Sequence, residues 1–239
     1  MRVYVGTSGW LYDWNPDGSL DWYVKYSGLN AVELNASFYR IPYPSQVRSW
    51  SSKGKGLRWS IKVNQYITHY YKLSGRALEV WDRFASVFKP MDDLVDFYLL
   101  QLPPNFKATG ENVAKLRDYV RSVGLGWRLA VEFRHESWFN EATVNLCRDL
   151  GVTLVSIDSP MRTWVVSSGD TVYLRLHGRS SWYLYDYSLE ELRELASAAV
   201  ERAKGRIYVF FNNNHYMLGN ARIMKGLLEE LVASRLSGF

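Results

Sequence analysis

The sequence contains a single cysteine, Cys147, and therefore cannot form an internal disulfide. Disulfides support many small secreted domains, so nothing here indicates an oxidising compartment. No apolar run reaches the roughly 20 residues that a membrane-spanning helix needs. The first residues, MRVYVGTSGW, are typical of a strand followed by a turn, so we expect no secretory leader. These absences together predict a cytoplasmic protein that has no membrane segment.

The chain also lacks low-complexity tracts and any long linker rich in Pro, Gly or Ser. Its 239 residues are 47% hydrophobic and 22% charged, a composition typical of a globular protein. Without a linker to divide it, we expect one domain over residues 1–239. A single α/β barrel commonly has about this length.

Short β-rich runs alternate with amphipathic runs along the chain. Eight runs rich in β-branched and aromatic residues are predicted as strands: 2–7, 31–36, 58–63, 96–101, 128–133, 153–158, 171–177 and 206–212. Helices are predicted over 109–123, 140–151, 188–203 and 220–234. Strands that alternate with helices form a parallel sheet, and eight repeats close most economically into a (β/α)8 TIM-type barrel. An open doubly wound sheet is the alternative, although no Gly-rich phosphate loop follows the first strand.

One connection is too short for a complete repeat. Only the 13 residues 159–171 separate the sixth and seventh predicted strands. A helix with a loop at each end does not fit easily into this length. We therefore expect an irregular crossover between these two strands.

Polar side chains gather on one face of the predicted strands, toward their C-terminal ends. Alternate residues of a strand share a face, so parity assigns each side chain to one of two sides. The polar face carries Glu33, Asn35, Lys62, Gln101, Glu132, Arg134, Asp158, Arg175, His177 and Asn212. The C-terminal end of a barrel is where active sites lie. A purely structural ion-pair network is the alternative, but burying six formal charges is costly enough to favour a ligand site.

The residue types on this face indicate acid–base chemistry on an anion. His177 is the first candidate for proton transfer near neutral pH, with Glu132 or Asp158 as the second group. Arg134 and Arg175 can each bind a carboxylate or phosphate through two parallel hydrogen bonds.

Lys62 lies on the same face, between these arginines in the predicted barrel. Burial beside arginines would lower its pKa and make it a candidate nucleophile for imine chemistry, although an ion-pair role is also compatible with its position.

A divalent metal is possible but not favoured. Glu33, Glu132, Asp158 and His177 are suitable oxygen and nitrogen ligands. Lysine and arginine side chains in the same cavity would repel a cation, and the sequence has no HxxxH or HxH spacing.

Aromatic residues make up 15% of the chain and crowd the expected C-terminal rim, with Trp10 and Tyr39 among the candidates for substrate contact. Aromatic faces stack on sugars and nucleobases. A small anionic, ring-bearing substrate such as a nucleotide or a sugar phosphate is therefore predicted.

Nucleic acid is the alternative partner, bound by a binding protein or cleaved by a metal-dependent nuclease. The net charge is +5 and the pI is about 9.2, which favours anionic partners in general. The densest basic patch comprises Arg48, Lys53, Lys55 and Arg58.

Several segments resemble the YecE-like family, also called domain of unknown function 72. The resemblance is carried by VGTSGWLYDW, VELNASFYRIP, ITHYYKL, LLQLPPNF, VEFRHESWF, YLRLHG and YVFFNNNHYMLGNA. It spans residues 3–225 and implies a TIM-barrel fold, but it implies no established activity. Relative to this family, the chain is trimmed around residues 159–171.

Overall fold

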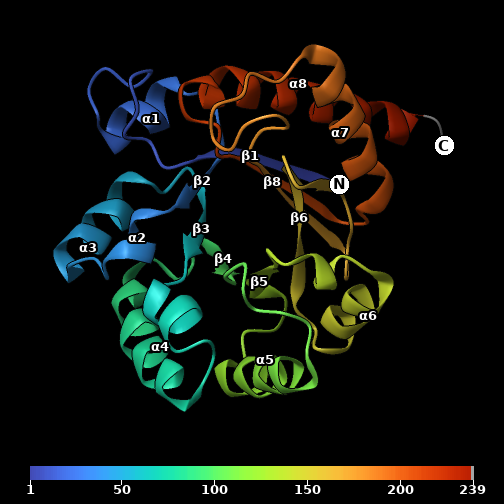
Figure 1. Cartoon of the computed structure of the whole chain (residues 1–239). Helices are drawn as coiled ribbons and strands as arrows, with labels where there is room; N and C mark the ends of the chain where they lie inside the picture. Colours follow the sequence, from blue (N-terminus) through green and yellow to red (C-terminus); the bar gives the residue numbers. More distant parts are fainter. Residues whose placement is uncertain (238–239) are drawn as a thin grey trace.

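Eight parallel strands close into a barrel in the computed structural model, which describes residues 1–237 (Figure 1). These strands are β1 (Arg2–Ser8), β2 (Ala31–Leu34), β3 (Arg58–Lys62), β4 (Val95–Gln101), β5 (Leu129–Glu132), β6 (Thr153–Ser159), β8 (Thr171–Leu176) and β9 (Arg206–Phe211). Each strand pairs with its neighbours in the order β5-β4-β3-β2-β1-β9-β8-β6, and a further pairing between β5 and β6 closes the ring. The predicted (β/α)8 fold is confirmed.

The helices surround the barrel on its outside (Figure 1). They are α1 (Leu20–Tyr26), α2 (Ala36–Tyr39), α3 (Pro44–Lys53), α4 (Gly75–Phe88), α5 (Gly110–Val123), α6 (Glu141–Asp149), α7 (Leu189–Arg202) and α8 (Met217–Ser237). Short turns of helix supplement them: the π-helical η1 (Tyr66–Tyr70) and the 3-10 turns η2 (Lys89–Met91), η3 (Gly126–Arg128), η4 (Glu136–Trp138) and η5 (Asn214–Tyr216). In the part of the chain that the structure describes, no helix is both long and apolar enough to cross a bilayer.

The helix boundaries follow local capping chemistry. Ser188 accepts a hydrogen bond from the Glu191 N–H at the start of α7, and the Glu191 carboxylate accepts one from the Ser188 N–H. Thr109 and Asn140 cap α5 and α6 in the same manner, through one side-chain acceptor each. All four predicted helices are present, and α8 begins three residues earlier than expected, at Met217.

The crossover between β6 and β8 contains no helix, as the short connection predicts. The chain instead turns back as β7 (Arg162–Trp164), which pairs antiparallel with β6. The Ser156 hydroxyl donates to the Val166 carbonyl at 2.9 Å and accepts from its N–H at 2.9 Å. A hairpin and a loop therefore replace the helix that would follow β6, while α6 still packs against this strand.

The apolar core forms two layers, one inside the barrel and one between the strands and the helices. The inner layer comprises Ala31, Phe97, Leu99, Ala130, Val155, Ile157, Tyr173, Tyr208 and Phe210. Val155 and Ile157 show that β6 turns its apolar face inward, which is the opposite of the parity prediction for this strand. Above this layer, at the C-terminal ends of the strands, the barrel interior becomes polar.

Candidate functional site at the C-terminal mouth of the barrel

Arg175 on β8 is the centre of a buried ion-pair network. Its Nε and Nη2 donate to the two carboxylate oxygens of Glu33 on β2, at 2.9 and 2.6 Å. Its Nη1 donates to Glu132 on β5 at 2.5 Å, so one guanidinium joins strands from opposite sides of the barrel. All three side chains are fully buried. Arg175 is therefore paired with two protein carboxylates and is not available to grip a substrate, as the sequence had suggested it would.

Arg134 extends the network toward the mouth. It follows β5 and forms an ion pair with Glu132. Its Nη2 lies 3.1 Å from His177 Nε2 and 3.5 Å from the Gln101 carbonyl oxygen. The indole of Trp182 covers its guanidinium, with 4.9 Å from Cζ to the ring centroid. Arg134 is buried apart from 6% of its surface, whereas Arg175 is buried completely.

His177 is fully buried, and its pKa is lowered to about 3 by burial and by the charge of Arg134. The imidazole is therefore neutral at pH 7, and its Nε2 faces the Arg134 guanidinium. This differs from the expected side chain that titrates near neutral pH. The main reason is that the ring is completely buried, and the charge of Arg134 adds to this effect.

Glu132 is also unsuited to exchange a proton near neutral pH. Burial alone would raise its pKa, but Arg134 and Arg175 hold the pKa of this carboxyl well below its usual range. Glu132 thus remains ionised and serves to hold the two arginines.

Lys62, at the end of β3, is the cation near this network that has no carboxylate partner among the described residues. Only 9% of its surface is exposed. Within residues 1–237 its ammonium forms no ion pair, and it lies 4.4 Å from the centroid of the Phe38 ring. Burial and then the charge of Arg175 lower its pKa to about 7, in the direction that the sequence predicts. At neutral pH a substantial fraction of this amine is unprotonated.

Asp158 does not join the network, and its predicted inward placement is wrong. It lies on the outer face of β6, where it accepts hydrogen bonds from Thr163 and from the Tyr187 hydroxyl at 2.7 Å. It also pairs with Arg179 at 3.2 Å. These partners come from β7 and from the loop after β8, which lie beside the C-terminal end of β6. Asp158 holds the loop after β8 in place.

The remaining predicted residues lie around the mouth in different settings. Asn212 Nδ2 lies 3.4 Å from His177 Nδ1. Asn35 immediately precedes α2, and its side-chain oxygen is buried without a hydrogen-bond partner among the described residues. Tyr39 is 70% exposed and lies outside both the network and the cavity described next.

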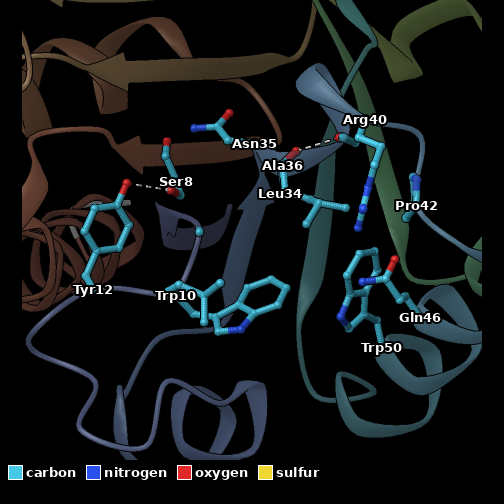
Figure 2. Close-up of a pocket in the computed structure, with 13 residues that line it drawn as sticks. Ser8, Trp10, Tyr12, Leu34, Asn35, Ala36, Arg40, Pro42, Gln46 and Trp50 are labelled. Atoms are coloured by element: carbon cyan, nitrogen blue, oxygen red, sulfur yellow. Dashed lines mark hydrogen bonds between the residues drawn. The ribbon is translucent and has the colours of Figure 1, made fainter.

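A cavity of about 410 Å³ opens beside the network, between the loops that follow β1 and β2. Figure 2 shows Trp10, Leu34 and Trp50 around it, with Asn35 at one end and Arg40 pointing toward Trp50. Trp10 and Asn35 were candidates from the sequence, whereas Arg40, Gln46 and Trp50 were not. The spacing of Gln46 and Trp50, four residues apart after Pro44, would have placed both on one face of a helix.

The metal and nucleic-acid alternatives gain no support from this geometry. In the described part of the chain, no three or more His, Cys, Asp or Glu residues gather where they could hold a metal ion. Two of the four residues of the basic patch are paired with carboxylates, Lys53 with Asp21 and Arg58 with Asp96.

Comparison with known proteins places this chain among proteins without an assigned activity. The model of the family described as protein of unknown function DUF72 matches residues 4–236. A crystal structure of a DUF72 family protein from Thermotoga maritima is 31% identical, with a TM-score of 0.81, and the match covers 98% of this chain and 100% of that one. A comparison with curated proteins found no match.

Two further structures have lower sequence identity. A DUF72 family protein from Enterococcus faecalis is 22% identical, with a TM-score of 0.81 over 95% of this chain and 96% of that chain. A xylose isomerase domain containing protein from Salmonella typhimurium is 14% identical, with a TM-score of 0.55 over 91% and 93% of the two chains, and thus shares the fold alone. Because the family model spans almost the whole sequence and the Thermotoga maritima relative matches from end to end, the chain belongs to the DUF72 family.

Proposed function

We propose that this protein is an enzyme that acts on a small anionic substrate at the C-terminal mouth of the barrel, with Lys62 as the group that accepts a proton. The observation that carries this proposal is the state of Lys62. Its amine is nearly buried, has no carboxylate partner among residues 1–237, and has a pKa lowered to about 7 by burial and by Arg175. A general base works best when its pKa lies near the operating pH.

The balance of charge at the mouth supports an anionic substrate. Two carboxylates, Glu33 and Glu132, face the two guanidinium groups of Arg134 and Arg175. Protonated Lys62 makes the cluster positive by one charge. An anion placed beside Lys62 and Arg134 would restore neutrality and would also raise the pKa of the lysine. Substrate binding would thereby strengthen the tendency of Lys62 to take a proton from the substrate.

The other polar residues have positioning roles in this proposal. Glu132 pairs with Arg134, and the neutral His177 ring lies against the same guanidinium at 3.1 Å. Together they hold Arg134 in place through its Nε and Nη2, which leaves Nη1 to donate to a carboxylate or a phosphate. The expected substrates are ring-bearing anions such as nucleotides and sugar phosphates.

The test is turnover of a panel of nucleoside phosphates and sugar phosphates, followed by mass spectrometry, with Lys62→Arg as the key variant. This change keeps a positive charge but removes a base that titrates near neutral pH. We expect it to lower turnover by about 10²–10⁴-fold. The wild-type kcat/KM, which reports the free enzyme, should rise with pH through about 7, where Lys62 loses its proton.

Lys107→Arg is the matched control, because Lys107 is exposed on the loop after β4. It should leave turnover unchanged. Undiminished turnover by a folded Lys62→Arg protein would show that Lys62 is not the base.

A further inference from the structure

The cavity between the loops after β1 and β2 has the walls of a ring-binding site. Trp10 and Trp50 contact each other edge to face, with ring centroids 6.0 Å apart and planes at 80°. Trp50 also stacks on the buried Trp59, at 6.5 Å and 26°. Leu34 and Pro42 complete the apolar lining. Because the indoles hold one another in place, a flat ligand would meet a preformed surface.

Two side-chain amides supply polar groups at the same cavity. The Asn35 carbonyl oxygen is buried and has no hydrogen-bond partner in the described chain, although buried polar atoms are rarely left unpaired. Gln46 uses its carbonyl oxygen to accept from the Tyr43 N–H at 3.0 Å, which leaves its amide N–H groups as donors. An unsatisfied acceptor on Asn35 and free donors on Gln46 match the donor and acceptor edges of nucleobases.

The cavity has no acidic lining residue among the described residues. The Glu33 carboxylate nearby is fully buried, and Ser8, a lining residue, donates to it at 2.8 Å. Sugar hydroxyls are donors as well as acceptors, so a site for a sugar ring would need several acceptors. This lining therefore suits a planar heterocycle better than a sugar.

The cavity opens at the same end of the barrel as Lys62. Ser8 and Asn35 lie at the C-terminal ends of β1 and β2. Ser37, which also lines the cavity, donates through its hydroxyl to the Lys62 backbone carbonyl at 2.7 Å. The short helix α2 thus contacts both, because Ser37 lines the cavity and the Phe38 ring lies 4.4 Å from the Lys62 ammonium.

We infer that this cavity binds a planar nitrogen heterocycle of the nucleobase type, carried by the anionic substrate. The assignment rests on the proposed function for the anionic part of that substrate. Trp10 and Trp50 pack against the ring, while Asn35 and Gln46 hydrogen-bond to its edge. Arg40, which points toward Trp50 at the rim, adds a positive charge beside the ring (Figure 2).

The experiment measures binding of the four ribonucleosides, which carry the ring without an anionic group, by isothermal titration calorimetry. At least one should bind with a Kd of about 1 mM or below, and glucose should not bind at the same concentration. Asn35→Leu and Gln46→Glu should each raise the Kd of that nucleoside by about tenfold. Gln46→Glu keeps the oxygen that caps the Tyr43 N–H, so α3 retains its start.

Asn145→Leu is the control, since Asn145 is exposed on α6. Its nucleoside affinity should equal that of the wild type. The inference is overturned if no nucleoside binds, if glucose binds equally well, or if Asn35→Leu and Gln46→Glu both keep full affinity.

Failure of this inference can be told apart from failure of the proposed function. Lys62→Arg should leave nucleoside affinity unchanged within about twofold, because Lys62 meets the anionic part of the substrate. Nucleoside binding together with full turnover by Lys62→Arg would support the ring site and would show that Lys62 is not the general base. Turnover that depends on Lys62 without any nucleoside binding would reject the ring site alone.

Discussion

Two clusters of charge lie at opposite ends of the barrel and differ in how completely they are paired. At the N-terminal ends of β3 and β4, Arg58 forms two hydrogen bonds to Asp96, and the Tyr208 hydroxyl donates to the same carboxylate at 2.6 Å. In this floor cluster the Arg58 cation is paired directly with the Asp96 anion. The mouth cluster, formed by Glu33, Lys62, Glu132, Arg134, Arg175 and His177, holds one cation more than it has carboxylates.

The comparison separates structural ion pairs from a candidate site. When each charge has a partner, burial and pairing offset each other and the network serves packing. When one cation has no carboxylate partner of its own, burial outweighs the more distant carboxylates and its pKa moves toward neutrality. Lys62 is that cation. The same physical rule thus predicts a structural role for the floor and a chemical role for the mouth.

The largest expected effect comes from removing the centre of the mouth cluster. Arg175→Met would leave Glu33 and Glu132 buried without their shared partner. We expect the free energy of unfolding to fall by about 3–5 kcal/mol, measured by urea denaturation. Arg58→Met is the matched floor variant, and it should cost less because a third of the Arg58 side chain is exposed. Equal losses would remove the distinction between the two clusters.

The second prediction is that replacing Lys62 by an apolar residue stabilises the protein by an amount that depends on pH. The pKa of Lys62 falls from 10.5 to about 7 on folding, so between these values the unfolded chain holds a proton that the folded chain lacks. The stability of the wild type therefore rises with pH across this window. Below about pH 7 the folded protein bears the full free-energy cost of burying the protonated Lys62 amine. Lys62→Met should be more stable than the wild type at pH 6 by a few kcal/mol.

This difference should shrink toward zero as the pH approaches 10.5. Urea denaturation of both proteins at several pH values measures it, with Lys107→Met as a control that shows no such trend. A wild type that is the more stable protein at pH 6 would mean that Lys62 is paired after all.

The smallest effect concerns the floor cluster. Tyr208→Phe removes the hydroxyl that donates to Asp96 and should cost about 1–2 kcal/mol of stability. Calorimetric binding of inorganic phosphate should remain the same as in the wild type, whereas Arg134→Met should weaken it. If Tyr208→Phe weakens phosphate binding as much as Arg134→Met does, the floor is not merely structural.

Most of the fold was predictable from local patterns. Eight β-rich runs at regular intervals predicted the strands, and the short 159–171 segment predicted the crossover without a helix. Helix α4 was not assigned, although Ala77, Trp81, Phe84 and Phe88 bury one face of it at helical spacing. The same periodicity that identified α5 could have identified it.

The site was predictable only in part, because parity sorts a strand into two faces without saying which one points inward. For β2, β3, β5 and β8 the polar face lies inside, and Glu33, Lys62, Glu132 and Arg175 meet there. For β6 the choice is reversed, and Asp158 lies outside the site. The pKa of His177 is lowered first by burial and then by Arg134, which is 43 residues away along the chain. No local pattern predicts how deeply the ring is buried or how close these two side chains lie.

The central claim is that Lys62 is a buried, unpaired amine at the mouth of the barrel. Reductive ¹³C-methylation of the lysines followed by NMR titration measures its pKa directly, and the signal missing from Lys62→Met provides the assignment. The account predicts a pKa of about 7 for Lys62, with the exposed lysines titrating near 10.5. A Lys62 signal that titrates together with the exposed lysines would contradict it.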